Sequence, residues 1–162
     1  MPPKLNGKEI YAAVLLLLIS TLLLTAQVIE SFSSYSDAAI RSEKSSLIVN
    51  TKSILNTIYS YALAILGLLG GIFMFRIKRI GWIFTTSLFV FYLVLAVYGL
   101  NEIGWDEYDL GFIIVAVPTL LFLMAAVFLF FRSTLQKFRV GKKTILPTLL
   151  LFMALITLFF LK

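Results

Sequence analysis

The chain has 162 residues, of which 60% are hydrophobic and only 14% are charged. A water-soluble domain usually carries about 25% charged residues, so this composition excludes an ordinary soluble fold. The net charge of +6 comes from cations that flank long apolar stretches. This placement indicates membrane lipid, and not nucleic acid, as the counter-charge.

Cysteine and histidine are both absent from the sequence. Disulfides, thiolate zinc sites, iron–sulfur clusters and histidine-ligated metals are therefore excluded. Nucleophile systems that depend on a histidine base are excluded as well. We expect a protein without a cofactor and without enzymatic activity.

Five apolar stretches follow one another along the chain, separated by short polar segments. A helix of about 20 apolar residues is long enough to cross a hydrocarbon core about 30 Å thick. We therefore predict an all-α integral membrane protein, a bundle of about five transmembrane helices that forms a single domain over residues 1–162. The predicted spans are 10–30, 54–75, 80–100, 110–131 and 144–161. The last stretch is just long enough to cross, and its alternative is a helix that lies at the membrane interface.

The first apolar stretch follows a short cationic leader, which is also the pattern of a secretory signal peptide. Ala26 would be the small residue at a cleavage site, but Leu24 is unfavourable two residues before it. The apolar run of about 20 residues is also longer than a usual signal core. We predict a retained first span.

Residues 31–53 form the only long polar stretch before the acidic segment. Within it, Ile40, Leu47 and Ile54 recur every seven residues, which places an apolar stripe on one face of a helix. We predict that the second helix extends beyond the bilayer on the outer side, with Ser36 or Asp37 capping its start. Its stripe would pack on a similar extension of the first helix. The alternative is a disordered serine-rich loop.

Gly67 and Gly71 form a Gly-x-x-x-Gly pair in the second span. Small residues one turn apart allow two helix backbones to approach closely. The sequence favours packing against another helix of the same chain over a dimer interface.

An acidic segment, NEIGWDEYD at 101–109, separates the third and fourth spans. It is a candidate partner-binding site because interfaces are enriched in aromatic anchors of this kind. A solvated turn and a divalent-cation site are the alternatives. The candidate residues are Glu102, Trp105, Asp106, Glu107, Tyr108 and Asp109.

Two basic segments, 76–79 and 132–143, contain no acidic residue. Each cation near an anionic membrane surface contributes about 1 kcal/mol to lipid attraction. The candidate lipid contacts are Arg76, Lys78, Arg79, Arg132, Lys137, Arg139, Lys142 and Lys143.

The orientation follows from the distribution of cations among the short segments that flank the spans. With the N-terminus in the cytoplasm, the inner segments hold ten of the fourteen Lys and Arg residues and the outer segments hold four. We predict a plasma or inner membrane protein with a cytoplasmic N-terminus and an outer C-terminus.

No charged residue lies in the middle of a predicted span, and Glu30 comes closest, at the outer end of the first. This absence argues against a proton-coupled pump. We predict a non-enzymatic accessory or assembly subunit that binds another membrane protein, or itself, in the lipid bilayer. The alternative is a small oligomeric transporter or channel lined by the hydroxyls of Ser20, Thr25, Thr86 and Tyr92.

Overall fold

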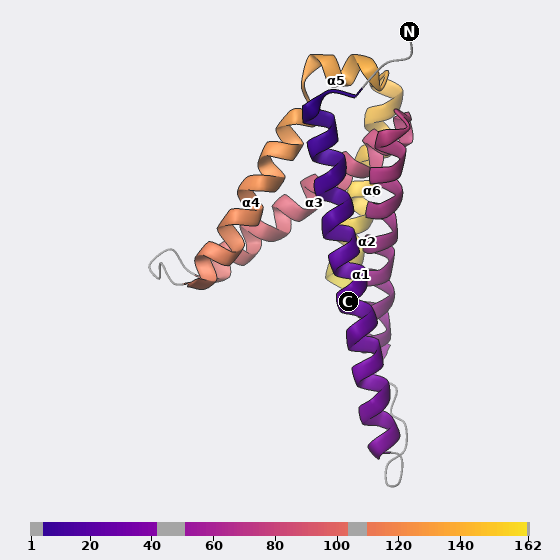
Figure 1. Cartoon of the computed structure of the whole chain (residues 1–162), viewed down its shortest axis with the longest axis vertical. Helices are drawn as coiled ribbons and strands as arrows, with labels where there is room; N and C mark the ends of the chain where they lie inside the picture. The colour runs from indigo at the N-terminus through magenta and orange to yellow at the C-terminus, as the bar shows by residue number, and fades with distance from the viewer. Residues whose placement is uncertain (1–4, 42–50, 104–109, 162) are drawn as a thin grey trace.

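The computed structural model describes residues 5–41, 51–103 and 110–161, and every element in these ranges is a helix (Figure 1). Five of these helices are long and one is short. They are α1 (Gly7–Arg41), α2 (Thr51–Phe75), α3 (Arg79–Ile103), α4 (Leu110–Leu129), α5 (Arg132–Lys137) and α6 (Lys142–Leu161).

Four segments are long and apolar enough to cross a membrane, namely Gly7–Ser33, Asn56–Phe75, Arg79–Leu100 and Lys142–Leu161. A fifth apolar segment in the described chain, Val115–Leu129 of α4, is shorter. The prediction of an all-helical membrane bundle is therefore confirmed at this level. The segment 142–161, which by sequence was the least certain to cross, is one of the four.

The helical continuation through residues 31–41 belongs to α1 and not to the second helix. With 35 residues, α1 is about 52 Å long at 1.5 Å per residue. Ser36 and Asp37 lie inside α1 and cap no helix start, and α2 begins only three residues before Ile54. The prediction assigned this stretch to the wrong helix because an apolar stripe does not show which neighbouring span it continues. Leu47 lies outside the described residues.

The apolar side chains in the second half of α1 are not buried against another helix. Val28, Ile29 and Phe32 are exposed, with Phe32 reaching 73%. The predicted contact of these side chains with a second helical extension is therefore absent from the described part of the chain. The alternative of a disordered loop is also wrong for residues 31–41, which are helical.

Helix α3 is the centre of the bundle because it packs against α1, α2, α4 and α6. Its buried aromatic and aliphatic side chains form much of the core. Trp82 of α3 donates a hydrogen bond from Nε1 to the carbonyl oxygen of Leu129, at 3.0 Å. Tyr59 of α2 donates to the carbonyl oxygen of Leu155 in α6, at 3.3 Å. Such bonds satisfy polar groups that lipid could not.

Helices α2 and α3 are joined by a turn in which Ile77 has a φ of 51°. The amides of Ile77 and Lys78 donate to the carbonyls of Met74 and Phe73, which is the Schellman arrangement that ends a helix. Gly81 is required after this turn, because a Cβ there would lie 2.4 Å from the backbone of Phe73.

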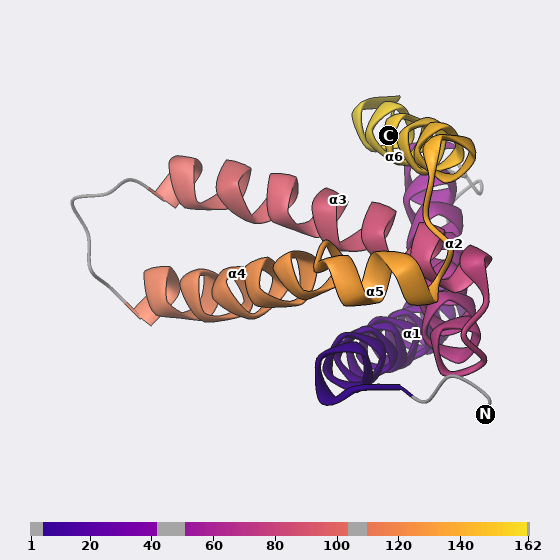
Figure 2. The same cartoon turned by 90° about the horizontal axis from the view of Figure 1, so that it is seen from above.

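The two halves of the molecule diverge. Figures 1 and 2 show that the axes of α1, α2 and α6 are roughly aligned, while the α3–α4 hairpin slants away from them. The hairpin touches the other helices at the end that carries α5, and its far half extends away from α1 and α2.

Candidate functional site

Basic residues gather at one end of the molecule. The start of α1, the α2–α3 turn, α5 and the start of α6 all lie at this end (Figure 1). We call it the basic end. The sequence-predicted lipid contacts at this end are Arg76, Lys78, Arg79, Arg132, Lys137, Arg139, Lys142 and Lys143.

One of these cations is held inside the protein by an acidic partner. The Nζ of Lys137 in α5 lies 2.5 Å from Oε2 of Glu9 in α1, and the two side chains are 12% and 1% exposed. Lys8 lies over the ring of Phe131, 3.7 Å from its centroid. These contacts fasten the start of α1 to the corner between α4 and α5. Because Lys137 is paired with Glu9, it is a weaker candidate for lipid contact than its exposed neighbours.

Sequence reasoning missed the burial of Glu9 and singled out Glu30, which is exposed. A local signal was present, because Asn6 and Glu9 have the spacing of a capping box. The backbone amide of Asn6 donates to Oε2 of Glu9 at 2.8 Å, which satisfies one of the free amides at the helix start. The contact with Lys137 joins residues 128 positions apart, and no local pattern predicts it.

The segment 132–143 was treated as a basic loop, but it contains the six-residue helix α5. Arg139, with a φ of 53°, ends α5 in the same way that Ile77 ends α2. The amides of Arg139 and Val140 donate to the carbonyls of Gln136 and Leu135. Helix α5 therefore places Lys137 over α1 and brings the chain back to start α6.

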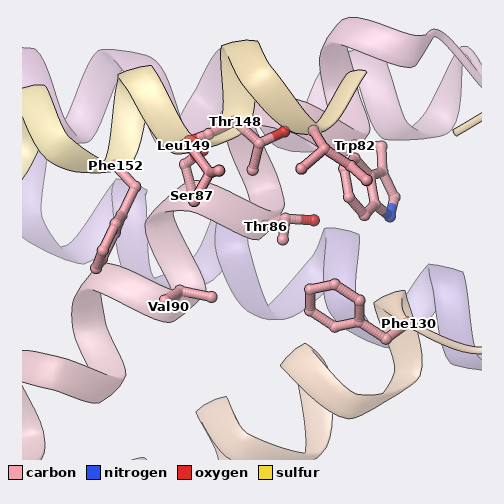
Figure 3. Close-up of a pocket in the computed structure, with 9 residues that line it drawn as sticks. Trp82, Thr86, Ser87, Val90, Phe130, Thr148, Leu149 and Phe152 are labelled. Atoms are coloured by element: carbon pink, nitrogen blue, oxygen red, sulfur yellow. Dashed lines mark hydrogen bonds between the residues drawn. The ribbon is translucent and has the colours of Figure 1, made fainter. Parts of the chain in front are cut away.

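Just inside the basic end, α3 and α6 enclose a cavity of about 270 Å³, which we call the α3–α6 crevice. Trp82, Thr86 and Val90 recur every four residues and so share one face of α3. Thr148, Leu149 and Phe152 come from α6, and Phe130 from the residue directly after α4 (Figure 3). Ser87 and Ile145 complete the lining.

Three residues that carry hydroxyl groups line this crevice, but none of their oxygen atoms is exposed in it. Ser87 donates to the carbonyl oxygen of Thr148 at 3.0 Å, which ties α3 to α6. Thr148 donates to the carbonyl of Thr144 at 2.9 Å. The hydroxyl of Thr86 points toward the space between Trp82 and Phe130 (Figure 3). It is buried and has no hydrogen-bond partner in the described structure.

Gly67 and Gly71 lie against α1 of the same chain. A Cβ on Gly67 would lie 1.9 Å from the Oγ of Ser20, and one on Gly71 would lie 2.5 Å from the side chain of Leu17. The absence of side chains at these two positions allows α1 and α2 to pack closely.

The predicted acidic partner site falls mostly outside the part of the chain that the structure describes. Trp105, Asp106, Glu107, Tyr108 and Asp109 are not described, and Glu102 belongs to the last turn of α3. Residues 101–103 are therefore helical and not part of a loop, although the segment of α3 that is long and apolar enough to cross a membrane ends at Leu100, the predicted end of the third span. Partner binding by this segment stays a prediction.

The hydroxyl groups proposed to line a transport path do not share one interface. Ser20 faces α2, and Thr25 is exposed and donates to the carbonyl one turn earlier in α1. Thr86 faces the α3–α6 crevice, whereas the ring of Tyr92 packs against α4. The structure therefore does not bring these four groups together.

No protein-family model, curated protein sequence or solved structure matches the chain.

Proposed function

We propose that the chain is a small non-enzymatic membrane protein that acts by packing against another membrane protein as an accessory or assembly subunit. The observation that supports this function is the divergence of the α3–α4 hairpin from α1 and α2 (Figure 2). The far half of the hairpin carries exposed apolar side chains, with Val97 61%, Ile113 58% and Val117 51% exposed. A transmembrane helix of a partner would bury these side chains.

The distribution of polar groups also favours this reading over transport. Several polar side chains in the bundle bond to carbonyls or charges within the chain, including Trp82, Ser87 and Lys137. A transport path needs polar groups that face a shared space, and the hydroxyls named above are distributed among separate interfaces. The far half of the α3–α4 hairpin therefore offers mainly apolar contact to a partner.

The proposal includes a topology. All five long helices cross the membrane, with α4 completing its crossing through the residues that precede Val115. The basic end faces the cytoplasm of a plasma or inner membrane, as the preference of cations for the cytoplasmic side requires. The N-terminus is then cytoplasmic and the C-terminus is outside.

Site-specific photo-crosslinking combined with affinity purification tests the partner. A photoreactive phenylalanine analogue is placed at Val97 or Ile113 of the hairpin. The matched control places it at Leu158, a residue of α6 that is 51% exposed. After irradiation in native membranes, the tagged chain is purified in mild detergent and its adducts are identified by mass spectrometry.

We expect one discrete protein adduct from Val97 and Ile113 and only lipid adducts from Leu158. Lipid adducts alone at all three positions would refute the proposal. Adducts between two copies of the chain would instead support a homo-oligomer, and flux assays in proteoliposomes would then test the transporter.

A further inference from the structure

An open hollow of about 370 Å³ lies at the end of α4, where the chain turns into α5 at the basic end (Figure 1). We call it the α4 hollow, and its walls come from Ala126, Val127, Phe130 and Phe131. Val127, Phe130 and Phe131 are 51%, 54% and 40% exposed. The hollow therefore lies on the outside of the bundle, where apolar side chains meet the membrane.

A positive charge is fixed beside one wall of the α4 hollow. The Nζ of Lys8 lies 3.7 Å from the centroid of the Phe131 ring and 5.8 Å from that of Phe128. Lys8 is exposed, and contact with an aromatic face orients its ammonium group without neutralising the charge. Arg132, which is also exposed, directly follows Phe131 at the start of α5. The wall formed by Phe131 is therefore accompanied by two cations.

No exposed acid balances these two charges in the described part of the basic end. Glu9, which follows Lys8 in the sequence, is the one acidic residue described there. It is 1% exposed, and its carboxylate is paired with Lys137. The surface beside the α4 hollow therefore attracts an anion.

The exposed apolar surface continues from the hollow along α4 toward the middle of the membrane. Leu123 and Leu120 precede Val127 by four and seven residues, so the three side chains share one face of the helix. Leu123 and Leu120 are 48% and 60% exposed. Val127 and Leu120 are about 10 Å apart along the helix axis. This is most of the depth of about 15 Å that an acyl chain crosses in one leaflet.

We propose that the α4 hollow is a binding site for an anionic glycerophospholipid. The headgroup phosphate lies against Lys8 and Arg132, and one acyl chain occupies the hollow and follows Leu123 and Leu120. Of the lipid contacts predicted from the sequence, this site includes Arg132 alone, and it adds Lys8. The inference does not depend on a protein partner, so the crosslinking experiment above and the experiment below can fail separately.

Crosslinking with photoactivatable lipids tests the site at the residues that would contact the lipid. The protein is reconstituted into phosphatidylcholine vesicles that contain a minor fraction of a probe with a diazirine in its acyl chain. The probe is either phosphatidylglycerol, which is anionic, or phosphatidylcholine, whose choline group balances the phosphate. After irradiation, adducts on residues 120–131 are quantified by peptide mass spectrometry. Adducts on Ile65 and Leu69, exposed side chains in the middle of α2, are the internal reference.

We expect the ratio of phosphatidylglycerol to phosphatidylcholine adducts to be higher on residues 120–131 than on the α2 reference. The expected excess is about fivefold for each cation that contributes. Lys8→Gln and Arg132→Gln together remove the excess. Lys142→Gln and Lys143→Gln together are the matched control, because they remove two exposed cations from the same end, and they leave the excess unchanged.

A second pair of variants tests the hollow itself. Val127→Phe fills it and lowers the yield of phosphatidylglycerol adducts on residues 120–131. Met124→Phe, which enlarges an exposed side chain of α4 outside the lining, retains the yield.

Equal ratios on residues 120–131 and on the α2 reference would overturn the proposal. An equal effect of the two charge pairs would also overturn it, because the attraction would then belong to the whole basic end. The same holds for an equal effect of Val127→Phe and Met124→Phe. If Val127→Phe does not fold, the charge pairs decide alone, since all four of these cations are exposed. Absence of adducts from both probes on residues 120–131 would mean that another molecule covers the hollow, and the proposal would fail.

Discussion

The buried contact between Glu9 and Lys137 gives the most direct prediction about what holds the basic end together. Oε2 of Glu9 accepts from the amide of Asn6 at 2.8 Å and from Lys137 at 2.5 Å. The other carboxylate oxygen, Oε1, is buried without a partner in the described structure. Lys137→Met would therefore leave a buried negative charge with one remaining donor.

The expected cost follows from the energetics of such pairs. A hydrogen bond to a charged group contributes about 1.5–3 kcal/mol, and removal of one partner of a buried ion pair costs about 3–5 kcal/mol. We expect Lys137→Met to destabilise the contact of α5 with α1 by about 3 kcal/mol, which raises the open population about 150-fold. The backbone amides of residues 132–140 would then exchange with deuterium correspondingly faster.

Substitution of the other partner, Glu9, should destabilise the protein less. Glu9→Gln can still accept from the amide of Asn6, as glutamine does in a capping box. Lys137 is partly exposed, and its long side chain can turn its ammonium group toward water. We expect a loss of about 1 kcal/mol. The double variant should resemble Glu9→Gln alone, because no buried charge is left unpaired.

Hydrogen–deuterium exchange measured by mass spectrometry, on protein in detergent micelles, compares all three variants. Lys143→Met is the matched control because Lys143 is exposed at the same end of the molecule. Two results would refute the reasoning. One is additive effects of the two substitutions, and the other is an equal effect of Lys137→Met and Lys143→Met.

Three further experiments test other contacts in the bundle. Gly67→Ala should destabilise the protein by about 1–3 kcal/mol through overpacking, which lowers its thermal unfolding temperature in detergent. Ser20→Ala should partly restore that temperature, because it removes the Oγ that the new Cβ would meet. If Ser20→Ala gave no rescue, the described α1–α2 contact would be contradicted. Arg139→Gly should stabilise the end of α5 by about 1 kcal/mol because glycine adopts a positive φ without strain, and faster amide exchange of α5 in this variant would count against it. Ser87→Ala should weaken the packing of α6 on α3 by about 0.6 kcal/mol, because the hydrogen bond to the carbonyl of Thr148 is lost. The backbone amides of α6 should then exchange with deuterium faster. Unchanged amide exchange would mean that this bond does not contribute to stability.

The sequence contained enough information to locate the helices but not to join them correctly at every point. The predicted span 54–75 ends at the same residue as α2, because a basic turn follows a long apolar run. Helix α5 was missed because its six residues include one apolar side chain, Leu135, which is too little for an apolar repeat that would indicate a helix. Residues 31–41 were assigned to the wrong helix because an apolar stripe does not show whether it continues the span before it or the span after it.

The candidate sites were predictable only where the chemistry is local. The two basic segments were evident from charge alone, and the Gly67 and Gly71 pair from spacing. The burial of Glu9 and the position of Thr86 at the α3–α6 crevice depend on contacts between distant parts of the chain. Periodicity shows that Trp82 and Thr86 share a face of α3, but it does not show that α6 lies across it.

The packing of α6 on α3 has a consequence for the biogenesis of the protein. Helix α6 is synthesised after α2 and α3, and its Thr148 and Leu155 provide carbonyl acceptors for side chains of α3 and α2. Until α6 is inserted, Ser87 and Tyr59 lack these acceptors in the hydrocarbon. A nascent chain in which α6 is not yet inserted would thus lack the bond of Ser87 to Thr148, and the hydrocarbon offers no acceptor in its place.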